Sequence, residues 1–358
     1  MTVFLDHLRS AVELPLPPRV GPGATLAVEM FFMISGFYMA LILGEKYLGK
    51  DALRAFYKNR LLRLYPAYLF VVVVWFSIVV IFRLSHGQWT LYGPIVPMFA
   101  QATWLTKLHV IVANLTFVGQ NALFFLKYCA DGSLALHCTD TSAIPPSAML
   151  LLPQAWSIEV EILFYLLCPL ILRLRTRTLA LLICVLLALK TYAVYATSPD
   201  NDYWIFRFPG FEFALFFLGI IAYRIYKNHL KNKKIGAFGY GIISVFAFFF
   251  IICQFIPWNE VKFSAAYILT FAALPFLFRL SKSNKKDRWI GDLSYPIYLV
   301  HWPVMRLIFY WYRTDHVILP ATAATIIVSI LVNYFVQRPI EKFRVFKRKP
   351  DSTAGPAA

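Results

Sequence analysis

The chain has 358 residues, of which 59% are hydrophobic and 15% charged, and its formal net charge is +17. Soluble domains have about 45–50% apolar and about 25% charged residues. The apolar residues lie in long blocks, and several blocks reach the ~20 residues needed to cross the hydrocarbon core of a bilayer. Lys and Arg gather at the block ends, which is the positive-inside pattern. The distribution therefore argues against a soluble fold and against nucleic acid as a partner.

The blocks predict an all-α, polytopic integral membrane bundle of about 9–10 membrane segments, because backbone polar groups in lipid must be satisfied within a helix. In chain order they cover about 25–44, 64–83, 109–126, 155–172, 178–196, 208–226, 236–256, 262–280, 293–312 and 317–336.

Residues 1–24 contain Asp6, Glu13 and four prolines, so we expect neither a signal peptide nor a spanning helix there. The block at 25–44 ends on the side of a basic connector, so it has to begin outside without a helix before it. We therefore interpret 1–24 as the remnant of a first helix or as disordered. Residues 25–341 form the predicted membrane domain, and 342–358 a basic cytoplasmic tail.

Charge predicts the orientation of the connectors. The basic connectors, expected in the cytoplasm with the C-terminus, are 45–63, 173–177, 227–234, 282–288 and 342–349. The less basic ones, expected outside, are 199–204, 257–260 and 313–316. If the sides alternate in this way, residues 108–154 must begin and end on the outer side of the membrane.

We therefore expect 109–126 to be re-entrant or interfacial, in preference to a further span at 91–105. Cys129 and Cys138 share the polar loop that follows. A disulfide between them fits an external loop, and a metal site using His137 is the less favoured alternative.

Ionisable residues inside spans are costly and often functional. In the segment 154–165, spacing places Ser157, Glu161 and Tyr165 on one helix face, with Glu159 about 200° away from Glu161. Glu161 is interpreted either as a site residue or as a structural carboxylate paired with an Arg. Glu29, Glu212 and Lys190 lie near the ends of their blocks.

In the segment 291–304, Ser294, Tyr298 and His301 also share a face. They either line a polar cavity, where His301 suits acid–base work, or form interhelical hydrogen bonds. Arg60 and Arg63 precede Pro66 at the expected start of a helix. They are interpreted as positive-inside anchors or as a phosphate site.

Four segments in this order resemble the acyltransferase-3 family of membrane O-acyltransferases. They are FFMISGF at 31–37, RLLRLYPAY at 60–68, WSIEVEILFY at 156–165 and SYPIYLVH at 294–301, and the closing RPIE at 338–341 is similar as well. Close helix approach at Ser35 and Gly36 is the structural reading of the first segment.

The resemblance implies a bacterial inner-membrane enzyme that moves an acyl group, often acetyl, from cytoplasmic acyl-CoA to a hydroxyl. It implies a glycan or lipid-linked glycan acceptor such as O-antigen or exopolysaccharide, contacts with membrane lipid and with glycan-assembly partners, and no bound cofactor or metal. Glu161, His301 and Tyr298 would then be catalytic, and Arg60 and Arg63 would bind the donor. The residues expected to line or pack the cavity are Ser35, Trp156, Ser157, Tyr165, Ser294 and Tyr295.

The N-terminus departs from the family pattern. The family's first helix carries a basic residue and, about three turns later, a histidine taken as the catalytic base. Residues 4–12 resemble the start of that helix, but ELPLPPRVGPGAT follows them. We therefore expect the catalytic histidine to be absent and do not assign its role to His7. Two alternatives stay open: a transporter of lipid-linked glycan, and an inactive relative that acts as a partner in glycan assembly.

Overall fold

The computed structural model describes residues 2–11, 23–47, 51–87, 89, 91–93, 95–196, 205–256, 260–311 and 317–344. The first part of this chain forms α1 (Thr2–Ala11), α2 (Ala24–Glu45), α3 (Ala52–His86), α4 (Ile95–Gln101), α5 (Trp104–Thr116), α6 (Ala122–Phe125), β1 (Lys127–Tyr128), β2 (Leu134–Ala135), η1 (Pro146–Met149) and η2 (Pro153–Ala155). The remainder forms α7 (Trp156–Ile171), α8 (Thr176–Ala196), α10 (Pro209–Ile225), η3 (Tyr226–Leu230), α11 (Ala237–Ile252), η4 (Cys253–Phe255), α12 (Glu260–Ser281), α13 (Lys285–Trp311), α14 (Ile318–Val332), η5 (Asn333–Gln337) and α15 (Arg338–Glu341).

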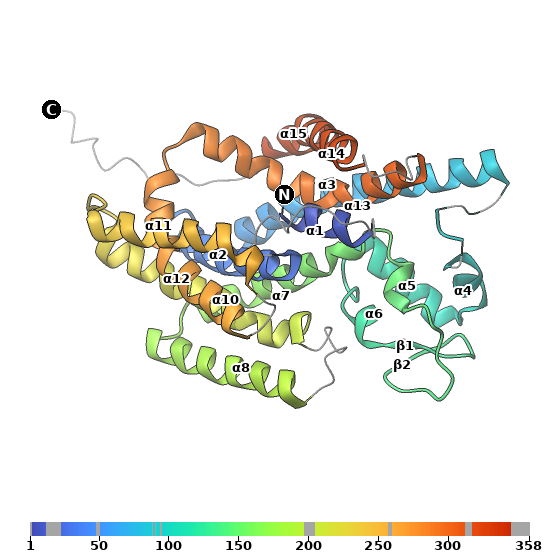
Figure 1. Ribbon diagram of the computed structural model, residues 1–358, viewed down its shortest axis with the longest axis horizontal. Helices are drawn as coiled ribbons and strands as arrows, with labels where there is room; N and C mark the ends of the chain where they lie inside the picture. The colour runs from blue at the N-terminus through green and yellow to red at the C-terminus, as the bar shows by residue number, and fades with distance from the viewer. Residues whose placement is uncertain are drawn as a thin grey trace.

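The protein is a bundle of long apolar helices (Figure 1). Within the described residues, eight helical segments are long and apolar enough to cross a membrane: α2, α3, η2–α7, α8, α10–η3, α11–η4, α12 and α14–α15. Helix α13 is 27 residues long and packs on α14 and α3. The all-α polytopic prediction is therefore confirmed.

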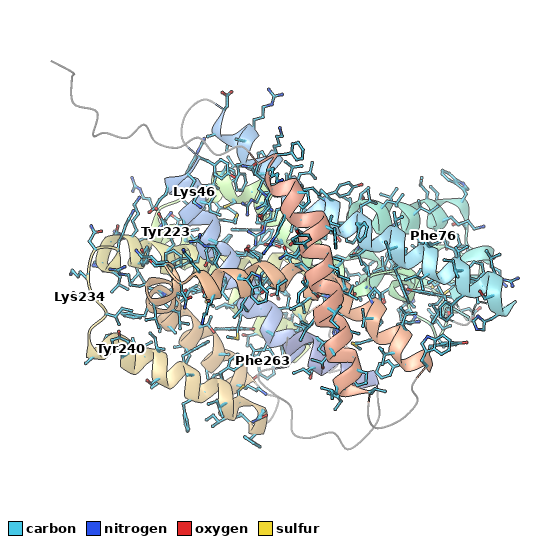
Figure 2. The ribbon with its side chains drawn as sticks, turned by 90° about the horizontal axis from the view of Figure 1, so that it is seen from above. Lys46, Phe76, Tyr223, Lys234, Tyr240 and Phe263 are labelled. Carbon is cyan, nitrogen blue, oxygen red and sulfur yellow. A yellow bond between two sulfur atoms is a disulfide. The ribbon has the colours of Figure 1, made fainter. Side chains whose placement is uncertain are left out.

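The two ends of the bundle differ in character. Figure 2 shows Lys46 and Lys234, from two connectors predicted to be cytoplasmic, toward one side, and Phe76 on α3 toward the opposite side. Figure 1 places α4, α5, α6 and the hairpin β1–β2 together at one end of the molecule. The positions of the two lysines agree with the alternation predicted from charge.

Glycines allow α2 and α10 to approach closely. A Cβ on Gly36 would lie 2.1 Å from the carbonyl oxygen of Phe216, and one on Gly219 would lie 2.0 Å from that of Met33. No larger residue fits at either position without separating the helices. The close approach predicted at Ser35 and Gly36 is confirmed.

Helix α3 corrects a predicted boundary. It begins at Ala52, so most of the connector expected at 45–63 is helical, and Pro66 lies inside the helix and not in its first turn. Proline lacks the N–H of a regular helical bond and usually interrupts a helix. Close to this proline, the Tyr295 hydroxyl of α13 donates to the carbonyl of Leu64 at 2.6 Å, which links α13 to α3.

The segment 109–126 is not a spanning helix, in agreement with the prediction. Helix α5 has 13 residues, or about 20 Å of length at 1.5 Å per residue, which is too short to cross. Several apolar side chains of α5, among them Trp104 (70% exposed) and Leu105 (60% exposed), are not covered by the protein.

Beyond α5, a disulfide joins Cys129 and Cys138.

A buried ion cluster joins three helices near one end of the bundle. Lys190 of α8 lies 2.5 Å from a carboxylate oxygen of Glu29 on α2 and 2.9 Å from one of Glu212 on α10. Both carboxylates are almost fully buried. These ion pairs thus hold three helices together. From the sequence alone, the three residues were known only to lie near the ends of their apolar blocks.

Parts of several predictions lie outside the described residues. These parts are 12–22 of the N-terminal segment, 48–50 of the connector 45–63, the connectors at 199–204, 257–259 and 313–316, and the tail from 345 onward. Within the N-terminal segment, 2–11 is helical and its Asp6 accepts a hydrogen bond from the Ala24 backbone N–H at 2.9 Å, which ties α1 to the start of α2.

Candidate active site

Glu161 lies on α7 at the centre of a buried polar cluster and is only 6% exposed. Its Oε1 accepts hydrogen bonds from the Ser35 hydroxyl of α2, at 2.9 Å, and from the Tyr165 hydroxyl one turn along α7. The face predicted from spacing is therefore present. Glu159 points elsewhere, and its carboxylate accepts from the backbone N–H groups of Gly119 (2.8 Å) and Asn121 (2.6 Å) after α5.

Tyr298 of α13 meets this face at Ser157. Its hydroxyl donates its single proton to the Gln154 carbonyl, which can only accept. The Ser157 hydroxyl, 2.6 Å away, must therefore donate to Tyr298. The Gln154 side chain in turn donates to the carbonyl of Leu299 at 3.0 Å. The structure thus brings together two motifs that lie about 140 residues apart.

Ser294 does not join this cluster, which corrects the prediction that it shares a cavity face with Tyr298 and His301. Its side chain is exposed, as are residues 283–292 before it, because the first part of α13 is not covered by neighbouring helices. Tyr295, the next residue, is partly buried and contacts α3 as described above.

Two histidines meet next to Tyr298. His7 of α1 and His301 of α13 lie 3.0 Å apart, between Nδ1 of His7 and Nε2 of His301, and their rings stack at 5.3 Å between centroids. The ring of Tyr298 lies 5.8 Å from that of His301. The other nitrogen of His301, Nδ1, is 3.2 Å from the carbonyl oxygen of Ile297.

These contacts fix the tautomers of both rings when they are neutral. The Ile297 carbonyl can only accept, so Nδ1 of His301 carries the proton and its Nε2 carries a lone pair. Nδ1 of His7 must then donate to His301. The lone pair of His7 therefore lies on Nε2. This is the arrangement of a general base whose orientation is set by a second residue.

The structure therefore places a histidine of the first helix beside His301, although the sequence analysis did not assign the role of the family histidine to His7. The family pattern has an apolar run with a histidine about three turns after the basic residue. In this chain the ten residues of α1 place His7 against α13. The two histidines are 294 positions apart, so no local spacing could have paired them. The one available signal was the likeness of 4–12 to the family's first helix.

Arg60 lies at the other end of the Glu161 cluster. It is 5% exposed, and its guanidinium carbon lies 5.8 Å from the ring centroids of both Phe56 and Tyr165. Its Nε and Nη1 are buried without a hydrogen-bond partner among the described residues. Arg63, one turn further along α3, is exposed.

Arg207, just before α10, was not expected from the sequence. Its guanidinium carbon lies 4.5 Å from the centroid of Phe124 and 4.8 Å from that of Trp156, so two aromatic faces hold the cation. Trp156 was expected as a packing residue and also contacts the ring of Phe32 at 6.4 Å.

Taken in order, the contacts trace a polar column through the bundle. It runs from the His7–His301 pair past Tyr298 to Ser157, then along the face of α7 that carries Glu161 and Tyr165, and ends at Arg60 over the Tyr165 ring. The separation of eight positions on α7 from Ser157 to Tyr165 corresponds to about 12 Å along the helix axis. In the part of the chain that the structure describes, no group of three or more His, Cys, Asp or Glu side chains could hold a metal ion. The column can therefore supply a base, hydroxyl donors and a buried cation.

The profile of the acyltransferase-3 family, described as an acyltransferase domain, matches residues 7–336, and thus nearly the whole chain. The chain belongs to this family. The match begins at His7, the residue that the structure places in the column.

Among curated proteins the chain is similar to O-acetyltransferase OatA of three Staphylococcus aureus strains, NCTC 8325 / PS 47, COL and MRSA252. Each is 26% identical over 361 residues, covering 92% of this chain and 55% of the relative. The chain therefore spans about half the length of these relatives. No solved structure matches the chain.

Proposed function

We propose that the chain is a membrane O-acyltransferase that moves an acyl group, most simply acetyl, from acyl-CoA to a hydroxyl of a cell-surface or secreted glycan. The observation that carries the proposal is the oriented base, His7, at one end of a column whose other end holds the buried Arg60. The membership of the acyltransferase-3 family and the similarity to O-acetyltransferase OatA support the reaction type.

The proposed reaction uses the column from both ends. Arg60 and Arg63 bind the phosphates of acyl-CoA at the cytoplasmic end, where positive charge is expected. Nε2 of His7 takes the proton of the acceptor hydroxyl as its oxygen attacks the thioester carbonyl. The C–S bond breaks, and the protonated His7 returns the proton to the departing thiolate, so that the products are an ester and free CoA.

The other residues position this chemistry. His301 accepts from Nδ1 of His7 and keeps the lone pair on Nε2, while Tyr298 and Ser157 order the wall of the column beside it. Glu161 accepts hydrogen bonds from two hydroxyl groups at the middle of the column, between Arg60 and the two histidines.

We place the protein in the bacterial inner membrane with its C-terminus in the cytoplasm. The disulfide between Cys129 and Cys138 supports this orientation, because disulfides persist outside the reducing cytosol. The acceptor is then an extracytoplasmic or lipid-linked glycan such as O-antigen or exopolysaccharide, with glycan-assembly proteins as partners.

The test is the O-acetyl content of surface glycan in a deletion strain that carries the chain, measured as acetate released by base. We expect the wild-type chain and the Glu45→Gln variant to restore O-acetylation and Glu161→Gln to fail. Glu45 is a matched control because it is a carboxylate at the end of α2, paired with Lys231 away from the column. An unchanged acetyl content in every strain would contradict the proposal and favour the glycan transporter or the inactive partner.

A further inference from the structure

Arg60 presents the strongest unused binding capacity in the described part of the chain. Two of its guanidinium nitrogens are buried without a hydrogen-bond partner there. Buried donors without partners are costly. A guanidinium also has the fork geometry that binds two oxygens of one phosphate. These properties indicate that an anion binds here.

A third arginine approaches this site from the end of the chain. η5 and α15 both pack against α3, and Arg344 follows α15 directly. The Arg344 side chain is only 13% exposed, and its Nη1 pairs with Glu341 at 3.0 Å. Its Nε is buried without a hydrogen-bond partner among the described residues.

The direction of the Arg344 pKa agrees with the packing of η5 and α15 against α3, the helix that carries Arg60 and Arg63. Burial lowers the pKa of Arg344, Glu341 opposes that change, and the positive charges of Arg63 and Arg60 lower the pKa further. Three arginines on α3 and on the segment packed against it, with Glu341 as the carboxylate that pairs with Arg344, carry an excess positive charge that suits a multiply charged anion.

We propose that Arg344 completes a three-arginine phosphate site with Arg60 and Arg63, and that its ligand is a phosphate group of the acyl-CoA donor. The inference rests on the proposed function and adds the segment after the last membrane helix to the donor site. A phosphate on an anionic lipid has the same chemistry. The donor is favoured because Arg60 is buried between helices at the end of the Glu161 cluster, whereas lipid headgroups contact the outer surface of a bundle.

The experiment measures CoA binding by titration calorimetry on the full chain in nanodiscs of phosphatidylcholine. Arg344→Gln is compared with Arg338→Gln, which removes the same charge from an exposed position on the same terminal segment. We expect Arg344→Gln to weaken CoA binding about tenfold or more, the usual effect of losing a hydrogen bond between charged groups. Arg338→Gln should leave it within about twofold. Pantetheine, which carries no phosphate, should bind both variants as it binds the wild type.

Each other result overturns the inference in a distinguishable way. If wild-type chain binds no CoA, the donor in the proposed function is wrong, and the three-arginine site falls with it. If wild type binds CoA and both variants match it, only the role of Arg344 is wrong. If the loss appears only in nanodiscs containing phosphatidylglycerol, the phosphate belongs to the lipid. Arg344→Lys, which keeps the charge but not the fork, should bind CoA with intermediate affinity and guards against a folding defect.

Discussion

The buried cluster of Lys190, Glu29 and Glu212 gives a prediction about stability. Lys190→Met keeps an unbranched apolar side chain, one atom shorter, but removes the only cation that contacts the two carboxylates in the described residues. The carboxylate side chains are 1% and 0% exposed, so water cannot compensate for the loss. Removing one partner of a buried ion pair costs about 3–5 kcal/mol. We expect the apparent melting temperature in detergent to fall by about 5–10 °C.

A second variant also removes the charges of the two carboxylates that Lys190→Met leaves without a cation. A triple variant with Lys190→Met, Glu29→Gln and Glu212→Gln should recover most of the lost melting temperature, because an uncharged cluster needs no counterion. Lys227→Met, in the exposed connector after α10, serves as the control for loss of a lysine and should melt as wild type does. Melting of Lys190→Met within about 1 °C of wild type would refute the reasoning, as would a triple variant less stable than the single one.

Two further predictions test the helix contact and the loop after α5. Gly219→Val places a Cβ 2.0 Å from the Met33 carbonyl oxygen, so we expect loss of the monodisperse peak in size-exclusion chromatography. Gly241→Val, where nothing lies within 4 Å, should keep it, and equal profiles would contradict the packing account. Glu159→Gln removes one of two acceptor oxygens for the backbone at 119–121, and hydrogen exchange of those amides should quicken about tenfold. Unchanged exchange there would show that the carboxylate does not hold this loop.

Much of the fold followed from the sequence because the bilayer restricts what a chain can do. Long apolar blocks had to become helices, and the short segment around α5 could not cross. Helical periodicity placed Glu161 on one face with Ser157 and Tyr165 and turned Glu159 away. These are statements about residues within a few turns of one another, where geometry is set locally.

The site needed the structure because its key contacts join distant segments. Nothing in the spacing pairs His7 with His301 or brings Lys190 between Glu29 and Glu212. The helix face on which a residue lies also did not decide whether its side chain is buried. Ser294 shares a stripe with His301, but the first part of α13 is uncovered, so burial depended on where neighbouring helices end.

The most direct test of the central claim measures free CoA released from acetyl-CoA by membrane vesicles that contain the chain, with a thiol reagent. His7→Gln is compared with wild type and with His86→Gln, an exposed histidine at the end of α3. A general base contributes about 10²–10⁴-fold to a rate, so we predict that His7→Gln falls to the level of empty vesicles while His86→Gln matches wild type. CoA release by His7→Gln at the wild-type rate would contradict the assignment of His7 as the base.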